Sequence, residues 1–341
     1  FRHPAPPDLI RCGLRLTAGP TRPSRSMIRL SSQDPMPQGL RGAVIALGNF
    51  DGVHRGHQQV IAQARELARN NVPLIVATFD PHPVRYFAPD VPPFRLTSLD
   101  QREELFAGLG ASAMLVFGFD RALAETSAED FIDRILVERL GAGGVVTGHD
   151  FTFGKGRRGS IDMLRDRCAA LGVATRIVSA VEEGGEVVSS TRIRKSLVEG
   201  NPVEAARLLT RPFAIRGEVI HGAKLGRSIG FPTANLLMGP YLRPRFGIYA
   251  VTGRVLTGPM AGGPLLKGAA NLGVRPSFDP PTELLEPFFF DFQGDLYGQT
   301  IEVALCRFIR PEEKYDTLDA LKDQIARDCD EARRLLTDIE G

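Results

Sequence analysis

The sequence predicts two domains of different class, an α/β domain followed by an antiparallel β-barrel that ends in a helix. In the first half, short apolar runs alternate with amphipathic helical stretches, a pattern typical of parallel strands joined by crossover helices. After Pro212, strand-like runs follow one another with Gly- and Pro-rich turns and no helix between them, which favours antiparallel pairing in a barrel. A length of 341 residues agrees with two domains, because domains commonly have about 150 residues.

The first forty residues form a separate segment that we expect to be unstructured. They contain seven prolines and show no apolar periodicity. The first thirty hold six arginines and one acidic residue, so this stretch is either an organelle transit peptide or upstream sequence translated ahead of a start at Met27. It carries a net charge of +5, which leaves −3 for the other 311 residues of a chain whose total is +2.

In the α/β domain, residues 41–187, each predicted strand is a short apolar run followed by a turn. The strands are 43–47, 73–79, 113–117, 144–147 and 174–178. Apolar residues at helical spacing over 60–68 predict a helix after the first strand. Ser98-x-x-Gln101 and Thr126-x-x-Glu129 have the form of capping boxes and predict the starts of two more helices.

A helical connector over residues 188–211 leads to the barrel domain, residues 212–338. The predicted barrel strands are 213–220, 247–256, 285–292 and 300–308. A long helix then closes the chain, and we expect its apolar stripe to pack against the barrel. The stripe consists of Leu318, Leu321, Ile325, Cys329, Ala332 and Leu336.

Composition excludes several classes of protein. Hydrophobic residues make up 43% and charged residues 24%, as in ordinary globular chains, and no apolar run reaches the roughly 18 residues of a membrane-spanning helix. Four cysteines without a Cys-x-x-Cys pair support neither a disulfide framework nor a zinc knuckle, so a reducing, cytoplasmic location fits best. The absence of Trp and of an interleaved basic and aromatic face argues against a nucleic-acid partner.

Residues 48–57, Gly-Asn-Phe-Asp-Gly-Val-His-Arg-Gly-His, lie between the first predicted strand and the first helix. A Gly-rich turn at this place directs backbone N–H groups and the positive end of the helix dipole to one spot, which suits phosphate oxygens. We therefore expect Gly48 and Phe50 to belong to a phosphate-binding turn. His54 and His57 can add donors to the same phosphate, and the alternative for either histidine is a helix cap.

A second polar stretch, residues 189–194, reads Ser-Ser-Thr-Arg-Ile-Arg and opens a predicted helix. Ser190 and Thr191 are either the cap of that helix or ligands of a phosphate group. Arg192 or Arg194 is suited to clamp the β- and γ-phosphates, because a guanidinium binds phosphate with two hydrogen bonds.

Residues 78–83 and 148–154 follow the ends of two other strands, where an open α/β sheet forms its cleft. In the second stretch, Phe151 and Phe153 either line a flat aromatic ligand or pack in the core. The basic residues 155–159 that follow predict a mobile loop.

These motifs carry a resemblance to a known superfamily. Residues 48–57 resemble the Gly-x-Phe-Asp-x-x-His-x-Gly-His signature of nucleotidyltransferases, and residues 189–194 resemble their Ser-Ser-Thr-x-Ile-Arg stretch. Residues 78–83 and 148–154 narrow the resemblance to bacterial FMN adenylyltransferases. It implies that His54 and His57 act at the α-phosphate of ATP. It also implies that Ser190, Thr191 and Arg192 hold the departing pyrophosphate, and that Asp150 and Phe153 contact the flavin.

The barrel domain carries its own motif at residues 222–235, which resembles at every fixed position the riboflavin kinase motif Gly-x-x-x-Gly-Arg-x-x-Gly-Phe-Pro-Thr-Ala-Asn. The hydroxyl of Thr233 and the carboxamide of Asn235 are hard oxygen ligands suited to Mg²⁺. Flexible glycines can fold over a triphosphate, and the residues expected to bind ATP here are Gly222, Lys224, Gly226, Arg227 and Gly230.

Glu286 lies inside the apolar run 284–292, where an unpaired carboxylate is costly. Phosphoryl transfer to an alcohol requires a carboxylate that takes the hydroxyl proton. In the riboflavin kinase family the matching glutamate is the general base; the alternative is a glutamate at the strand edge that faces solvent. Residues 270–276 also agree with this family, and Arg275 is expected at the flavin.

The resemblance covers residues 43–338 and implies a bifunctional bacterial FAD synthetase. The barrel is then expected to phosphorylate riboflavin with MgATP, and the Rossmann-like domain to adenylate the resulting FMN with a second ATP, giving FAD and pyrophosphate. The expected partners are these small molecules, with no nucleic acid and no membrane.

Two other classes stay open. One is a single-activity nucleotidyltransferase whose barrel is a structural appendage, and the other is a nucleic-acid-binding protein whose barrel grips single strands.

Overall fold

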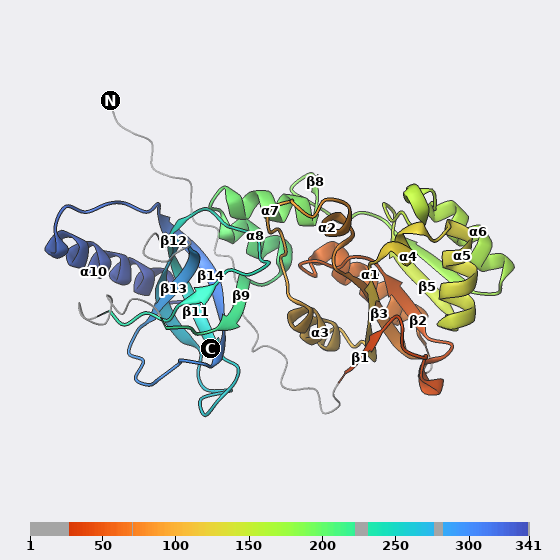
Figure 1. The fold of residues 1–341 in the computed structure, drawn as a ribbon, viewed down its shortest axis with the longest axis horizontal. Helices are drawn as coiled ribbons and strands as arrows, with labels where there is room; N and C mark the ends of the chain where they lie inside the picture. Colours follow the sequence, from red (N-terminus) through yellow and green to blue (C-terminus); the bar gives the residue numbers. More distant parts are fainter. Residues whose placement is uncertain (1–26, 70, 222–230, 276–281, 340–341) are drawn as a thin grey trace.

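The computed structural model describes residues 27–69, 71–221, 231–275 and 282–339, and it confirms an α/β domain followed by a β-barrel (Figure 1). The first domain is built around a six-stranded parallel sheet of order β1-β4-β3-β2-β5-β6. The central strands are buried on both faces, which explains why they read as continuous apolar runs. The strands are Ile28–Ser31 (β1), Val44–Leu47 (β2), Leu74–Asp80 (β3), Ala113–Gly118 (β4), Gly144–Gly148 (β5) and Ala174–Val178 (β6).

The order of the strands places a topological switch point beside β2. The chain leaves β2 for β3 on one side and later returns to β5 on the other, so a crevice lies outside the carboxyl ends of β2 and β5. Both of the predicted polar stretches 48–57 and 148–154 follow these two strands.

Helices cover both faces of this sheet. Helices α1 and α3 pack on one face through apolar side chains that include Ile61 and Phe106, while η2 and α6 pack on the other through Ile132 and Leu164. The helices of this domain are η1 (Gln38–Leu40), α1 (Arg55–Leu67), α2 (Pro83–Phe87), α3 (Leu99–Gly108), α4 (Arg121–Glu125), α5 (Ala128–Asp130), η2 (Phe131–Arg139), η3 (Lys155–Arg157) and α6 (Ile161–Ala170).

The two predicted helix starts have different outcomes. The Ser98 capping box is confirmed, because its side chain accepts from the backbone of Gln101 and the Gln101 side chain accepts in return from the backbone of Ser98. The Thr126 box is wrong by one residue: Ser127 caps α5 and accepts from the backbone N–H of Asp130.

The prediction that the first forty residues are unstructured is wrong from Ile28 onward. Residues 28–31 form β1, which pairs in parallel with β4, and residues 38–40 form η1. Leu30 and Leu40 are buried in the core of the domain. The four-residue strand was missed because a single buried leucine shows no periodicity.

The second domain is a nearly closed antiparallel barrel of order β10-β13-β12-β11-β14-β9. The two ends of this order approach each other through the hydrogen bond from the N–H of Ile220 to the carbonyl of Asn235. Strand β12 was not predicted. The strands are Phe213–Glu218 (β9), Leu236–Leu237 (β10), Gly247–Val255 (β11), Leu266–Arg275 (β12), Thr282–Phe289 (β13) and Thr300–Arg310 (β14).

The closing helix α10 (Leu318–Leu335) packs against β11, β12 and β14 at the far end of the molecule (Figure 1). Its predicted stripe is confirmed at Cys329, Ala332 and Leu336, which are buried against the barrel, whereas Leu318 is half exposed.

The connector is helical, as predicted, and lies between the two domains (Figure 1). It consists of α7 (Ser190–Val198) and α8 (Pro202–Leu209), preceded by a small hairpin of β7 (Glu182–Glu183) and β8 (Glu186–Val187). The apolar side chains of both helices belong to the same buried cluster as the barrel interior, and Leu96 of the first domain joins it.

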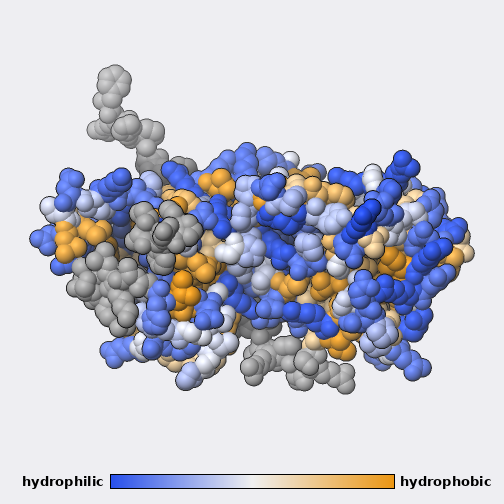
Figure 2. All heavy atoms as spheres, in the orientation of Figure 1, coloured by the Kyte–Doolittle hydropathy of each residue, from blue (hydrophilic) through white to orange (hydrophobic). Residues whose placement is uncertain are grey.

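Figure 2 shows hydrophilic residues over most of the face in view, with small hydrophobic areas between them. Among the helices that the structure describes, none is long and apolar enough to cross a membrane.

Candidate active sites

The turn between β2 and α1, which we name the histidine turn (residues 48–57), lies at the switch point of the parallel sheet. His54 is the N-cap of α1, and its Nδ1 accepts a hydrogen bond of 3.4 Å from the backbone N–H of His57. The two imidazole rings are stacked with their centroids 3.6 Å apart. The capping and the functional interpretation of His54 are therefore compatible, because the cap fixes the ring that the second histidine stacks on.

Both histidines are neutral at physiological pH. Burial lowers the pKa of His54 to about 4, against the nearby Asp51 carboxylate that raises it. Burial, followed by the neighbouring His54 and cations that include Arg194, holds the pKa of His57 well below its ordinary 6.5. The Nδ1 atom of His57 is buried and has no hydrogen-bond partner among the described residues. It is thus a free polar atom in a turn suited to phosphate.

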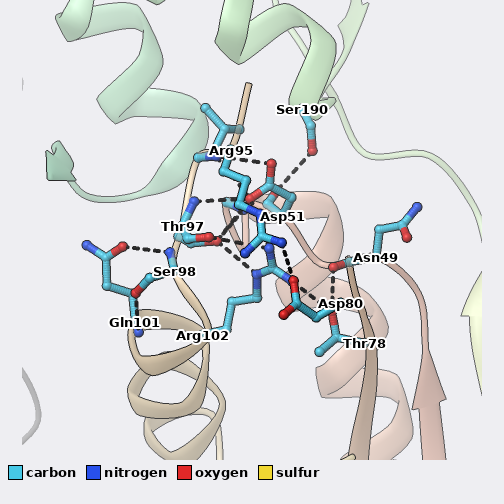
Figure 3. A network of polar contacts seen from close by, with 12 residues as sticks. Asn49, Asp51, Thr78, Asp80, Arg95, Thr97, Ser98, Gln101, Arg102 and Ser190 are labelled. Atoms are coloured by element: carbon cyan, nitrogen blue, oxygen red, sulfur yellow. Dashed lines mark hydrogen bonds and ion pairs between the residues drawn. The ribbon is translucent and has the colours of Figure 1, made fainter. Parts of the chain in front are cut away.

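The carboxylate of Asp51, a residue of the histidine turn, lies at the centre of a network of polar contacts (Figure 3). Asp51 is 1% exposed and accepts hydrogen bonds from the backbone N–H groups of Leu96 and Thr97, each at 3.0 Å. Arg194 of α7 donates to it at 2.7 Å, and the fully buried Arg102 of α3 lies 3.5 Å away. One acid therefore ties the turn to three other segments of the chain.

The turn holds strained backbone. Phe50 and Val53 have positive φ angles of 49° and 44°, a region that a β-branched residue such as valine rarely occupies. Such strain persists only where the surroundings fix the conformation. The buried Phe50 ring contacts His57 and Phe106 edge-on, so Phe50 contributes packing, and a Cβ on Gly48 would lie 3.3 Å from that ring.

The second predicted stretch approaches the same turn through Ser190. Its hydroxyl donates to the backbone carbonyl of Asp51 at 2.9 Å, while Ser189 serves as the cap of α7 and Thr191 is exposed. The cap predicted at Ser190 or Thr191 is therefore wrong by one residue. The Thr191 hydroxyl is exposed at the helix N-terminus, whereas the O–H of Ser190 is engaged by the Asp51 carbonyl.

Arg192 points away from the histidine turn toward the β7–β8 hairpin. Its guanidinium donates to the carbonyls of Glu183 and Glu186 and to the carboxylate of Glu204 at 2.8 Å. Arg194 reaches Asp51 instead and lies over the ring of Phe94. Of the two arginines weighed for the phosphate clamp, Arg194 is the one that the structure brings to the turn.

The stretch after β5 is divided between surface and core. Asp150 is exposed, whereas Phe153 is 6% exposed and packs with Phe131 and Phe151 at centroid distances of 5.4 and 5.7 Å. For Phe153 the core-packing alternative applies, because the ring has almost no surface left for a ligand.

An exposed aromatic cluster on the same side of the sheet was missed in the sequence. Tyr86 and Phe87 of α2 and Phe119 after β4 contact one another edge-on, with centroids 5.1 to 5.7 Å apart. Phe87 is 68% exposed, which is unusual for an aromatic ring that belongs to a cluster. The signal in the sequence was the aromatic pair that follows Asp80-Pro81-His82-Pro83.

In the barrel, a polar row crosses three neighbouring strands. Glu286 of β13 is paired with Asn271 of β12. On its other side lies Asn235, because Leu236 pairs with Leu285 and the N–H of Ala234 bonds to the carbonyl of Pro287. Residues opposite each other in a sheet share a face, so these three side chains stand together, with Thr233 two residues along.

The Glu286 carboxylate is paired with Arg275, which also binds Glu312 at 3.2 Å. This contradicts the alternative of a solvent-facing edge glutamate, since the Glu286 side chain is only 17% exposed. The predicted ATP-binding residues of the barrel lie outside the described residues; they are Gly222, Lys224, Gly226, Arg227 and Gly230.

The residues at this row fit a magnesium ion that arrives with its nucleotide. Mg²⁺ prefers oxygen ligands and is commonly held by one or two protein groups together with substrate phosphates. Thr233, Asn235 and Glu286 offer such oxygens, and the buried Oδ1 of Asn271 has no partner among the described residues. Among all the residues that the structure describes, no cluster of three or more His, Cys, Asp or Glu residues could hold a metal ion by itself.

The first domain has a histidine turn at the switch point of its parallel sheet, and the barrel has a paired carboxylate beside amide and hydroxyl oxygens. Together these two sites define a two-domain transferase of phosphorus-containing groups. Comparison with known proteins agrees with this class. The FAD synthetase family model matches residues 36–192, and the riboflavin kinase family model matches residues 209–336.

The bifunctional riboflavin kinase/FMN adenylyltransferase of Escherichia coli (strain K12) is 41% identical over 84% of this chain and 90% of its own length. Those of Pseudomonas fluorescens and Listeria monocytogenes serovar 1/2a are 39% and 36% identical, over 86% and 87% of this chain and 93% of their own lengths. A crystal structure described as a macrolide-efflux protein from Streptococcus pneumoniae superposes with a TM-score of 0.79 and 30% identity, covering 90% of this chain and 99% of that one.

The chain therefore belongs to the bifunctional riboflavin kinase/FMN adenylyltransferase family. The alternative in which the barrel is a structural appendage is wrong, because the riboflavin kinase model covers that domain.

Proposed function

We propose that the chain makes FAD in two steps, with one active site in each domain. The barrel transfers the γ-phosphate of ATP to riboflavin, and the N-terminal domain transfers the adenylyl group of a second ATP to the FMN produced. The observation that carries the proposal is the pair of neutral, stacked histidines at the switch point of the parallel sheet, in a chain whose second domain is a riboflavin kinase barrel.

In the adenylyl transfer, the phosphate of FMN attacks the α-phosphate of ATP, the bond to the β-phosphate breaks, and pyrophosphate leaves. FMN phosphate is ionised at neutral pH, so catalysis requires positioning and charge stabilisation rather than a protein nucleophile. We assign the contact with the α-phosphate to His54 and His57, and the Nδ1 of His57, which has no partner among the described residues, supports this role. Ser190 and Thr191 at the start of α7 are assigned to the pyrophosphate.

The positive charge beside the pyrophosphate is assigned to Arg194 in its present conformation. Arg192 stays a prediction for the same role, and to fulfil it the guanidinium has to leave Glu204 and the hairpin carbonyls. Gly48 and Phe50 contribute through the backbone of the turn.

The flavin ring is assigned to the aromatic cluster of Tyr86, Phe87 and Phe119. An isoalloxazine is flat and apolar on its faces, and stacking on an aromatic ring is worth about 0.5–1.5 kcal/mol beyond the area that it buries. Phe87 offers that surface, whereas Phe153 does not. Asp150 remains a proposed contact at the rim of the cleft.

In the barrel, Glu286 is assigned as the general base that takes the proton of the riboflavin hydroxyl, and Arg275 orients its carboxylate. Thr233 and Asn235 are assigned to Mg²⁺, which when bound neutralises charge on the transferred phosphoryl group. Arg275 could contact the flavin only if its guanidinium bound the flavin in addition to Glu286 and Glu312.

We propose that the chain acts in the cytoplasm on small molecules alone. A filter-binding assay with single-stranded DNA tests the remaining alternative of a nucleic-acid-binding barrel, and retention of DNA at physiological salt would support that alternative.

Chromatography of the products formed from riboflavin and MgATP tests both assignments. We expect His57→Ala to accumulate FMN without FAD, and Glu286→Gln to form no FMN from riboflavin while still converting added FMN to FAD. Each variant is the control for the other, because each keeps one reaction intact in the same folded chain. A variant that carried out both steps at the wild-type rate would contradict the role of its residue.

A further inference from the structure

The segment Leu209, Thr210 and Arg211 lies against the histidine turn, although it belongs to the region matched by the riboflavin kinase model, which begins at residue 209. It connects the end of α8 to the first barrel strand, β9. We name it the clamp segment. Neither its arginine nor its contacts have a part in the reactions assigned above.

Two carbonyls at the centre of the turn, those of Gly52 and Val53, accept hydrogen bonds from the clamp segment or from a side chain bonded to it. Arg211 donates from Nη2 to the carbonyl of Gly52 at 2.8 Å and from Nη1 to the carbonyl of Leu209 at 3.1 Å. Gln58 of α1 donates to the carbonyl of Val53 and to the hydroxyl of Thr210, each at 2.9 Å. The turn is thus bonded from the kinase side directly by Arg211 and indirectly through Gln58.

Packing adds to these hydrogen bonds. Gly52 has φ +87°, and a Cβ built on it would lie 3.2 Å from Cδ2 of Leu209 and 2.9 Å from Cδ1 of Leu96. The glycine is therefore enclosed by one leucine of the first domain and one of the clamp segment. The strained residues Phe50 and Val53 flank this enclosed position, so a fixed Gly52 carbonyl fixes the backbone that leads into His54.

Arg211 differs from the other arginines near the site in having no ion-pair partner among the residues that the structure describes. Arg194, Arg207 and Arg216 each form ion pairs with carboxylates. Among the described residues, no carboxylate lies within ion-pair distance of Arg211, whose hydrogen bonds go to two backbone carbonyls. Burying part of an unpaired cation costs desolvation free energy that carbonyl oxygens offset only in part. Such an arrangement therefore points to a function for Arg211.

We propose that Arg211 is a positioning residue of the adenylyltransferase site, supplied by the kinase region of the chain. By fixing the Gly52 carbonyl it holds the strained turn in the conformation that presents His54 and His57 to the α-phosphate. This inference rests on the adenylyl transfer proposed for the N-terminal domain. It makes that site incomplete without the segment that begins the second enzyme.

The test compares Arg211→Ala and Arg211→Lys with Arg216→Ala, in the full chain. FAD formation from FMN and MgATP, and FMN formation from riboflavin and MgATP, are measured separately as kcat and KM. Arg216 is a matched control, because it is an arginine of the same region that bonds Glu104 of the first domain and does not contact the turn.

For Arg211→Ala we expect kcat of FAD formation to fall by about 10- to 100-fold, since displacing a catalytic group by about 1 Å costs up to about 100-fold. KM for ATP should change by less than about 3-fold, and riboflavin phosphorylation should stay within about 2-fold of wild type. Arg211→Lys should recover part of the lost kcat, because an ammonium can still donate to the Gly52 carbonyl. Arg216→Ala should keep FAD formation within about 2-fold of wild type.

Riboflavin phosphorylation reports folding within the same molecule. Equal losses of both activities in Arg211→Ala, or no rescue by lysine, would show a merely structural role and overturn the inference. Wild-type kcat in Arg211→Ala would overturn it as well, while leaving the proposed function intact. A wild-type chain that formed no FAD would instead refute the proposed function, and this inference with it.

Discussion

Replacing Asp51 by asparagine removes one charge from the polar network that holds the histidine turn and keeps the size of the side chain. The carboxylate is 1% exposed, and its loss leaves the fully buried Arg102 and the half-buried Arg194 without the acid that they share. Leaving a buried charge without its partner costs about 3–5 kcal/mol. Because the amide oxygen can still accept from the N–H groups of Leu96 and Thr97, we expect the lower end, about 3 kcal/mol.

The assay is thermal unfolding followed by circular dichroism. At about 2–4 °C per kcal/mol for a domain of this size, Asp51→Asn should lower Tm of the N-terminal domain by about 6–12 °C. Asp162→Asn is the control, because Asp162 is 69% exposed and pairs with Arg165 on the surface of α6, where the loss should stay below about 0.5 kcal/mol. A decrease in Tm no larger than that of the control would refute the role given to Asp51.

The pH dependence gives a second check on the same variant. Burial raises the pKa of Asp51, but Arg102, Arg194 and the N–H of Leu96 outweigh it, so the pKa in the folded chain lies below the ordinary 3.8. Stability from this carboxylate is fully present above that ordinary value and is lost as the pH falls through the lower one. The difference in Tm between wild type and Asp51→Asn should therefore be constant above about pH 5 and narrow below about pH 4.

Three further predictions concern the histidines, the aromatic cluster and the loop after β5. Because burial lowers the pKa of His54 to about 4, its Cε1–H resonance in NMR should show no titration step between about pH 5.5 and 8; a step near 6.5 would contradict this. The depressed pKa also means that the chain loses stability as the pH falls from about 6.5 toward 4, since the unfolded chain then takes up the proton. Phe87→Ala should raise KM for FMN about 3- to 10-fold with KM for ATP unchanged, whereas Leu171→Ala, at an exposed residue in the turn after α6, should alter neither. Gly154→Ala should lower Tm more than Gly156→Ala, because both glycines have positive φ but only the first would place a Cβ 2.7 Å from neighbouring backbone atoms; equal decreases would argue against that close packing.

Local patterns in the sequence predicted most of the fold. Buried parallel strands such as 74–80 are continuous apolar runs, and the Ser98 box encodes its own hydrogen bonds. Strand β12 escaped prediction because glycines and asparagine interrupt its apolar pattern, although barrel closure places them. Strand β1 escaped because its stability comes from pairing with β4, more than 80 residues away in the sequence.

The site, too, was predicted where a local motif determines it and was missed where tertiary packing does. The motifs placed His54 and His57 between the first strand and the first helix, since spacing along one segment determines that relation. They named Glu286 and Asn235 separately, and only the pairing of β10 with β13 shows that the two lie side by side. The motifs did not show that Asp51 joins three segments, or that Arg194 rather than Arg192 faces the turn. Those facts depend on how α3, α7 and the segment 94–98 pack, which no single stretch encodes.

The buried cluster that unites the connector helices with the barrel interior bears on how the chain can be divided. A cut just before α7 would leave the first enzyme with Leu96 and Val188 uncovered, while the second would keep Ile193 and Leu209 on its own core. The kinase half is then the self-sufficient piece when it retains α7 and α8, and the adenylyltransferase half is the dependent one. A split of the gene before the connector would therefore yield a folded kinase, while the first polypeptide would lack Ser190, Thr191, Arg194 and Arg211, which the adenylyltransferase site takes from the second.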